Sequence, residues 1–412
     1  MNIISRPNCQ LKVNSMLNIL TPASESTDIT DLLVNLSLTS SSGNIALITN
    51  INGILNISGY QVLGYYVSTG TVAMIGINLN SETANVNKLS FQPLMYYVGN
   101  GSSFLFGNAV TTIDKIVITN VAFIMGNSTN YLLQGSIAAT YSNYYLFGGI
   151  IAQINCASLL SVNNVISDSY QTISSSYVRH SGFLVGYVYS KANSIIINNI
   201  CLQQNMTSTT QVFNYFGLIG SNYGNTSMQN ASIIFAAQVA AYSHCFGIIG
   251  IQWQSSLYAE VINLRTSISY SFSQGTCVGS IFGYLHSNTN NSIQNTTVFG
   301  GNISASGSSF VGGFCGFQDI SSTVTIFNSS ISITNISGST NVAGFVGQCQ
   351  ILNIINSKIL LVYLSCSSSV GIVSSNGGTF QISGSSSTQN YINGVKQSDC
   401  AILSNFWSAV GC

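Results

Sequence analysis

Apolar and polar residues alternate with a period of two along many short segments of this chain. Clear examples are SSISITNISG at 329–338, TSISYSFSQG at 266–275 and TTVFGGNISASG at 296–307. A period of two places every second side chain on the same face, which is typical of β-strands. No segment keeps apolar residues at i, i+3, i+4 and i+7, and Ile, Val, Tyr, Phe and Thr dominate over helix formers. The chain is therefore predicted to be all-β.

A short apolar block rich in glycine recurs along the sequence. Examples are FGLIG at 216–220, FGIIG at 246–250, VGGFCG at 311–316 and VAGFVG at 342–347. Measured on the last glycine of each block, from Gly107 to Gly347, the steps are 42, 37, 34, 30, 33, 33 and 31 residues. A period of about 30–37 residues lies in the range of solenoids, propellers and other repeat arrays. We expect the glycines to form a tight corner in which no side chain fits.

An asparagine follows each block, with an apolar residue two positions before it. In a stack of coils each position lies above its counterpart, so these asparagines are predicted to form a ladder of amide hydrogen bonds. Such a ladder would satisfy polar groups that a bend leaves unpaired. The predicted ladder consists of Asn120, Asn164, Asn199, Asn230, Asn263, Asn295, Asn328 and Asn356.

These repeats predict an elongated parallel β-solenoid, or β-helix, of about ten coils with a repeat of about 30–37 residues. We expect an N-terminal cap over residues 1–42, solenoid repeats over 43–374 and a C-terminal cap over 375–412. Caps are needed because bare solenoid ends pair with other chains, which makes end-to-end self-association one expected interaction. A propeller is the main alternative, although its units usually run nearer to about 40–45 residues.

The ten cysteines include no CxxC pair and no Cys/His cluster, which argues against a zinc site and against a redox dithiol. Cys245 and Cys277 each immediately precede a glycine block. If the coils are in register, these two sulfurs are neighbours in the stack, as a disulfide or as packed free thiols. Phe310 and Asn341 take the same position in the next coils, so the stack of sulfurs is expected to end there.

Only 18 of the 412 residues are charged, nine of each sign, whereas an ordinary soluble domain has about a quarter. The zero net charge removes the electrostatic case for nucleic acid. Mean hydropathy is +0.38, but no window offers the roughly 20 apolar residues of a membrane-spanning helix. In stacked coils aligned like charges repel, while Ser, Thr and Asn hydrogen-bond, which explains the low charge.

Catalysis finds little support in this composition. Acids occur about once per 30 or more residues beyond position 31, and residues 192–259 contain no Asp, Glu, Lys or Arg. A patch of Glu260, Arg265 and Asp319 across coils is the alternative that would suit a glycan-active enzyme. We predict that the chain is not an enzyme and assign no catalytic residue, cofactor or metal. The histidines are interpreted as corner residues rather than ligands: His180, His244 and His286.

Tyrosines cluster around the expected third to fifth coils. Tyrosine supplies flat apolar area together with a hydroxyl, which suits glycans and protein interfaces, although strand tyrosines are as often half-buried against neighbours. The candidate binding residues are Tyr141, Tyr144, Tyr145, Tyr187, Tyr189, Tyr215 and Tyr223.

The segment VGGFCG, an alternating stretch with an internal Asn, and then VAGFVG resembles the GLUG-type repeats of β-helical surface adhesins. The likeness spans roughly residues 105–375. It implies a cell-surface or secreted protein that adheres to cells, matrix or glycans, and it carries over no catalytic residue. The N-terminus lacks the apolar core of a secretory leader, so the chain is expected to be intracellular, exported by another route or part of a longer protein.

We therefore expect a structural or adhesive repeat protein of a cell surface or secretion route, which binds glycans or other proteins along its lateral faces. Two alternatives stay open at this point. One is a glycan-active β-helix enzyme of the lyase or glycosidase kind. The other is a self-assembling or ice-binding solenoid, for which TVTIF at 323–327 gives the only hint of a regular threonine rank.

Overall fold

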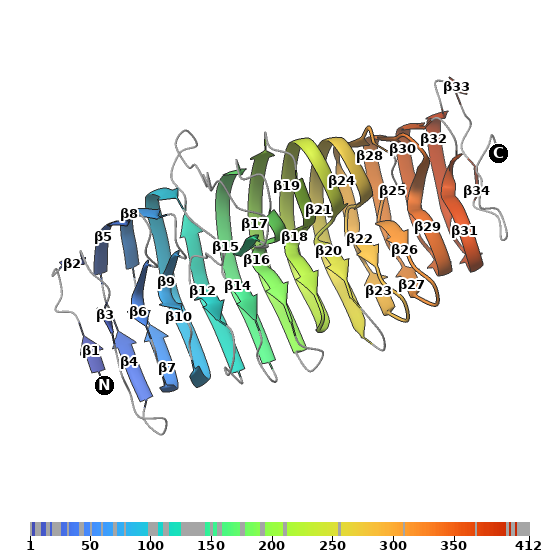
Figure 1. Cartoon of the computed structure of the whole chain (residues 1–412). Coiled ribbons are helices and arrows are strands. Elements are labelled where there is room, and N and C mark those ends of the chain that lie inside the picture. Colours follow the sequence, from blue (N-terminus) through green and yellow to red (C-terminus); the bar gives the residue numbers. More distant parts are fainter. Residues whose placement is uncertain are drawn as a thin grey trace. The chain divides into compact units, whose positions relative to one another are not determined.

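In the computed structural model every described element is a β-strand, and the chain forms two compact units, Met1–Thr210 and Gln211–Cys412 (Figure 1). In the first unit the structure describes the strands given below and residue 189. In the second it describes residues 212–253, 257–307, 310–366, 369–392, 395–396 and 400–401. No helix among these residues is long and apolar enough to cross a membrane.

Strands of the first unit pair in parallel with strands one coil further along the chain. Thus β1 pairs with β4, β4 with β7, β7 with β10, β10 with β12, β12 with β15 and β15 with β17. Parallel pairing therefore starts at Asn2, before the limit of residue 43 expected for the repeats. The strands are β1 Asn2–Ile4, β2 Gln10–Val13, β3 Leu17–Asn18, β4 Ser26–Thr30, β5 Leu33–Ser40, β6 Ile45–Thr49, β7 Asn52–Ser58, β8 Gln61–Ser68, β9 Val72–Ile77, β10 Asn80–Tyr97, β11 Phe106–Ala109, β12 Lys115–Ile124, β13 Tyr145–Gly148, β14 Ile151–Ile154, β15 Leu159–Ile173, β16 Val178–Val188 and β17 Ser194–Ser208.

The second unit repeats the same parallel pairing through to Ile392, after which β33 and β34 lie antiparallel on β32. The parallel coils thus continue beyond residue 374, where the C-terminal cap was expected to begin. The strands are β18 Val212–Asn222, β19 Asn225–Phe246, β20 Ile249–Gln252, β21 Tyr258–Gly279, β22 Phe282–Leu285, β23 Asn290–Gln294, β24 Thr297–Ala305, β25 Phe310–Gly312, β26 Cys315–Gln318, β27 Thr323–Phe327, β28 Ser330–Gly338, β29 Asn341–Ile355, β30 Lys358–Ser365, β31 Ser369–Ser383, β32 Ser386–Ile392, β33 Val395–Lys396 and β34 Cys400–Ala401.

One coil of the second unit shows how the sequence pattern builds the fold. Strands β25 and β26 form its first side, β27 its second and β28 its third. Every second residue points inward along β27 and along the start of β28, so that Val324, Ile326 and Ile331 are completely buried. Each inward side chain packs on its counterpart in the next coil, and the core therefore runs along the stack.

The glycine blocks form the corner where backbones approach most closely. A Cβ on Gly283 would lie 2.5 Å from the carbonyl oxygen of Gly250, and a Cβ on Gly347 would lie 2.6 Å from that of Gly316. These glycines are needed because backbone of the neighbouring coil fills the space that a side chain would take.

The prediction of a parallel β-solenoid is confirmed, and the propeller alternative is wrong because the described strands up to β32 pair in parallel with strands one coil away. On the second side, Met228 aligns through Val261, Ile293, Ile326 and Ile354 with Ile382. These five described steps belong to the second unit alone, and the first unit adds the six pairings given above, where about ten coils were expected for the whole chain. The last two of the five steps span 28 residues, shorter than expected, because β29 continues straight through the position of the turn that separates β26 from β27.

Candidate functional site

The predicted asparagines stand at the corner between the second and third sides of the coil. Asn164, Asn199, Asn230, Asn263, Asn295, Asn328 and Asn356 all have positive φ, between 48° and 54°. Asparagine enters this left-handed region more readily than most residues, which explains its recurrence at a sharp bend. Gly384, with a φ of 59°, takes the equivalent place one coil after Asn356. The side chain of the eighth candidate, Asn120, lies outside the described residues.

Amide hydrogen bonds join some neighbours in this row. Asn263 Nδ2 donates to Asn230 Oδ1 at 3.1 Å, and Asn328 Nδ2 donates to Asn295 Oδ1 at 2.8 Å. Asn199 Nδ2 donates instead to Asn163 Oδ1 at 3.2 Å. All these bonds are exposed, so the row does not satisfy buried polar groups as the sequence led us to expect.

In the later coils, buried N–H groups of the corner are satisfied by the residue that follows the corner residue of the next coil. The backbone N–H of Thr296 donates to Ser329 Oγ at 3.1 Å, that of Ser329 to Ser357 Oγ at 3.2 Å, and that of Ser357 to Ser385 Oγ at 3.0 Å. These four residues are at most 8% exposed. Sequence reasoning missed this hydroxyl ladder, although the Asn-Ser or Asn-Thr dipeptides at 295, 328 and 356 were its signal.

Cys245 and Cys277 are register partners on neighbouring strands, and both are buried free thiols. Phe310 and Asn341 follow in the same column. Burial raises the pKa of the Cys277 thiol, and its hydrogen bond with Cys245 raises it further. A thiol held this far from ionisation, such as that of Cys277, behaves as a small apolar group rather than as a nucleophile.

An aromatic strip follows the first side of the second unit from coil to coil. Its rings make contacts between centroids of 4.8 to 5.9 Å. Trp253 stacks on Tyr223 with planes 14° apart, and Tyr284 stacks on Phe317 with planes 8° apart. Stacked rings cover each other's faces, so a ligand meets mainly their edges. The strip consists of Tyr215, Tyr223, Trp253, Tyr284, His286, Phe310 and Phe317.

Most of the strip occupies the first and third positions after the last glycine of each block, whereas the second position points inward. Tyr284 and Phe317 are register partners at the first position, and Tyr223, Trp253 and His286 stand at the third. The inward residues include buried amides: Asn222 Nδ2 donates to Gln252 Oε1 at 2.6 Å, and Gln318 Nε2 donates to the carbonyl oxygen of Ile351 at 2.7 Å. These bonds tie adjacent coils together directly beneath the strip.

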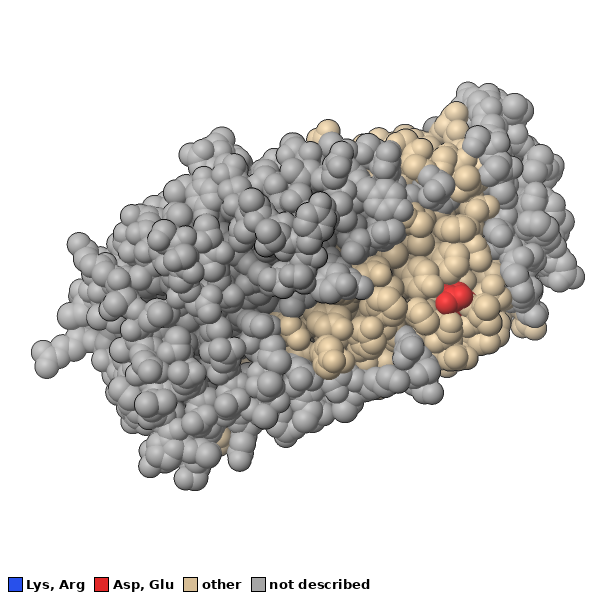
Figure 2. Space-filling model, in the orientation of Figure 1, with Lys and Arg blue, Asp and Glu red and all other residues tan. Residues whose placement is uncertain are grey.

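Asp319 occupies the same third position after a glycine block as Trp253 and His286, in the coil after that of His286. Its Oδ2 accepts hydrogen bonds from Ser287 Oγ at 2.9 Å and from the Tyr284 hydroxyl at 3.2 Å, while Oδ1 accepts from the N–H of Ile320 at 2.7 Å. Partial burial raises the pKa of this carboxyl, but these donors together with His286 outweigh it and set the pKa below its usual value. Figure 2 shows a face of the molecule on which the described surface is neutral apart from one acidic spot.

The tyrosines proposed from the sequence have different environments. Tyr215 and Tyr223 contact Trp253 and belong to the strip. In the first unit, Tyr187 packs against His180 at 4.5 Å and Tyr189 is 56% exposed. The side chains of Tyr141, Tyr144 and Tyr145 lie outside the described residues. Clustering along the chain missed Trp253, Tyr284 and Phe317, which a count from each glycine block would have found.

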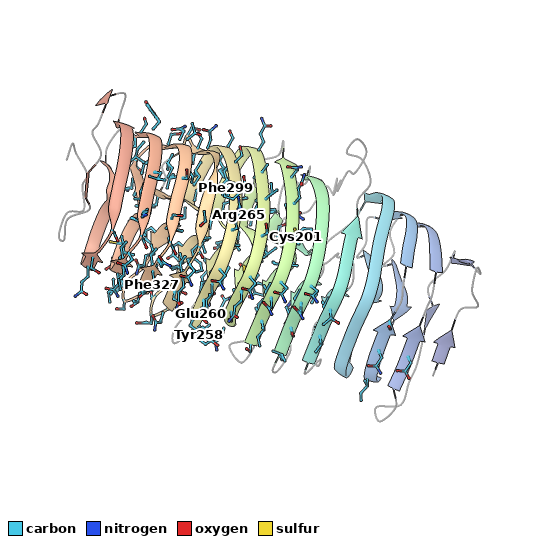
Figure 3. The ribbon with its side chains drawn as sticks, turned by 180° about the vertical axis from the view of Figure 1, so that it is seen from behind. Cys201, Tyr258, Glu260, Arg265, Phe299 and Phe327 are labelled. Carbon is cyan, nitrogen blue, oxygen red and sulfur yellow. The ribbon has the colours of Figure 1, made fainter. Side chains whose placement is uncertain are left out.

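The charges considered for catalysis do not form a cluster. Glu260 aligns through Ser292 with Thr325, six residues after Asp319, so two coils separate the two carboxylates. Arg265 lies over the Phe299 ring at 5.1 Å, on the other side of the Asn263 corner from Glu260 (Figure 3). The Glu260, Arg265 and Asp319 patch is therefore not formed.

From the sequence, the histidines were expected to be corner residues rather than metal ligands. His286 Nδ1 accepts a hydrogen bond from the N–H of Ser287 at 2.8 Å, as a turn residue does, and the side chain of His244 lies outside the described residues. In the part of the chain that the structure describes, no three His, Cys, Asp or Glu residues form a group that could hold a metal ion.

The class of protein that this fold defines is the parallel β-solenoid. No protein-family model, no curated protein and no solved structure matches the sequence. The resemblance to GLUG-type repeats is thus supported only as far as the β-helical fold.

Proposed function

We propose that this chain is a structural and adhesive β-solenoid, secreted or at a cell surface, which binds an extended glycan along its aromatic strip. The column of Tyr223, Trp253 and His286 carries this proposal, because it presents one ring per coil. Coils follow each other at about 4.8 Å, close to the length of one sugar in an extended chain. A glycan parallel to the stack would meet the same type of contact on each coil.

A glycan is favoured over a protein partner by the chemistry of the surface. Protein interfaces usually have an apolar centre of tightly packed hot spots. The large exposed apolar residues described here do not gather in one centre, since Phe327 lies on the second side of its coil, and Ile234 and Leu360 lie four coils apart on the third side. Hydroxyls, amides and ring edges instead suit a ligand that is itself covered with hydroxyl groups.

A binding role is also favoured over a glycan-active enzyme. General acid and base chemistry on a glycosidic bond needs two carboxylates on either side of it, at most about 9.5 Å apart. Glu260 and Asp319 lie two coils apart, or about 9.6 Å along the stack alone, and on different sides of the coil.

An ice-binding surface would need regular ranks of threonine. Thr323 lies between Asn290 and Ile351, and Thr325 between Ser292 and Asn353, so threonine does not repeat in either rank. The second side of the coil thus gives this alternative no support.

Binding of the purified full chain to an array of linear glycans tests the proposal. We expect binding to extended glycans, weakened at least about fivefold by Tyr284→Ala. Phe327→Ala is the matched control, because Phe327 is an exposed ring outside the strip, and it should bind as the parent does (Figure 3). Absence of binding to every glycan, or equal loss in both variants, would reject the proposal, and capture of protein ligands alone would favour a protein partner.

A further inference from the structure

We infer that Asp319 makes the strip selective for glycans that carry free primary amines. The inference rests on the glycan-binding function proposed above and names the class of sugar. Asp319 lies in the same column as Trp253 and His286, so a glycan that follows this column reaches the carboxylate. The backbone confirms this alignment: Trp253 N–H donates to Asn222 O, His286 N–H to Gln252 O, and Asp319 N–H to Leu285 O.

Within the described structure the hydrogen bonds to the Asp319 carboxylate come from uncharged groups. Every donor to its carboxylate is a neutral group, namely two hydroxyls and one backbone N–H. Among the described side chains, the titratable ones that act on its pKa are Tyr284, by a hydrogen bond, and His286, by its charge. Arg265 belongs to the third side of its coil, where it covers Phe299. The lowered pKa keeps the carboxylate ionised, so the strip ends in an anion whose internal source of opposing charge is the neighbouring His286.

The surrounding oxygens match the needs of an ammonium group. A primary ammonium donates three hydrogen bonds. Asp319 Oδ2 already accepts two bonds, so Oδ1 offers the free acceptor site beside the N–H of Ile320, and the hydroxyl oxygens of Ser287 and Tyr284 keep lone pairs after donating their own protons to the carboxylate. The stacked rings of Tyr284 and Phe317 present mainly their edges, which do not attract a cation, so the oxygens would hold the ammonium.

Asp319 also has a local structural role, which the test must separate from ligand binding. Its Oδ1 accepts the N–H of Ile320, and its backbone oxygen accepts from the N–H and Oγ of Ser322. Asparagine keeps an oxygen at the Oδ1 position for the N–H of Ile320 and removes the charge, while its Nδ2 takes the place of the oxygen that accepts from Ser287 and Tyr284. Asp319→Asn should therefore leave the turn intact while removing the attraction for an ammonium.

The experiment compares a glucosamine hexamer with an N-acetylglucosamine hexamer by calorimetry on the full chain, in mildly acidic buffer where the sugar amines are protonated. We expect the amine-bearing hexamer to bind about fivefold more tightly, the size of one partly exposed ion pair. Asp319→Asn should abolish this preference without weakening binding of the acetylated hexamer. Glu260→Gln, which removes the same charge elsewhere on the solenoid, should retain the preference.

Each outcome separates the inference from the proposed function. Equal affinity for the two hexamers, or a preference that survives Asp319→Asn, overturns the amine selectivity while the glycan-binding function stands. A preference lost equally in Glu260→Gln shows a net-charge effect and also overturns it. If neither hexamer binds, the amine selectivity is rejected. If no glycan on the array binds, the proposed function is rejected as well.

Discussion

Asn263 donates a hydrogen bond from its Nδ2 to Oδ1 of Asn230, 3.1 Å away and one coil earlier, and both residues hold a left-handed backbone conformation. The exposed bond is worth little by itself, because water competes for both amide groups. The backbone conformation is the larger contribution, since the left-handed region costs most residues about 1–2 kcal/mol. Asparagine therefore recurs chiefly because it can turn the chain.

Replacement of the corner asparagine separates these two effects. Asn328→Ala should destabilise the solenoid by about 1–2 kcal/mol, because alanine has a Cβ and no side-chain amide. Asn328→Gly should cost at most about half as much, because glycine adopts positive φ freely, as Gly384 does at the same corner. Urea unfolding followed by circular dichroism measures both changes. Equal losses would instead assign the stability to the amide hydrogen bonds.

The hydroxyl ladder gives a second prediction about stability. Ser329 Oγ accepts the backbone N–H of Thr296 and donates to the carbonyl oxygen of Phe327. Ser329→Ala leaves that buried N–H without a partner and should cost about 1–3 kcal/mol in unfolding free energy. Ser330→Ala is the matched control, because its Oγ makes only a long exposed contact with Thr297. If both variants unfold at the same urea concentration, the ladder does not stabilise the corner.

Because coils approach closely at the glycine blocks, the stability lost on replacing a glycine by alanine should depend strongly on its position. Gly283→Ala would bring a Cβ to 2.5 Å from Gly250 O and 2.6 Å from Phe246 N, both backbone atoms of the preceding coil. We expect a loss of about 1–3 kcal/mol or more. Gly301→Ala meets nothing within 4 Å and should change stability by less than about 1 kcal/mol. Comparable thermal shifts in the two proteins would contradict this explanation.

Cysteine reactivity should follow burial. Cys201 is exposed (Figure 3), whereas Cys245, Cys277, Cys315 and Cys349 are buried. Burial also raises the pKa of Cys349 to about 12, so its reactive thiolate is scarce near neutral pH. Alkylation of the native protein, read by mass spectrometry, should label Cys201 quickly and the four buried thiols only after denaturation. Recovery of a Cys245–Cys277 disulfide peptide would overturn the assignment of free thiols.

Several features of the fold were accessible from the sequence because they depend on local geometry. The alternation in segments such as 329–338 predicted strands, since a period of two separates buried from exposed side chains. The glycine blocks and the asparagines predicted coils, since each marks a backbone conformation that few other residues adopt. Even the column of Cys245 and Cys277 could be predicted, because both stand at the same distance from a glycine block.

Other features, such as individual hydrogen bonds between coils, depend on how the coils align, and the sequence pattern predicts that alignment only approximately. Asn199 bonds to Asn163 rather than to Asn164, and the last described steps shorten to 28 residues where one turn is missing. Small changes in turn length shift which side chains meet, and a shift of one residue moves a side chain to the opposite face.

For the candidate site, too, some features followed from the sequence and others only from the tertiary structure. The sequence by itself determined that a chain with so few charges would form stacked, neutral β-coils, because its repeats place like residues above one another. Only the tertiary structure decided that Trp253, Tyr284 and Phe317 form one strip, that it ends at Asp319, and that Glu260 lies elsewhere. Those relationships depend on contacts between residues about 30 positions apart, which are fixed only when each coil has closed on its neighbour.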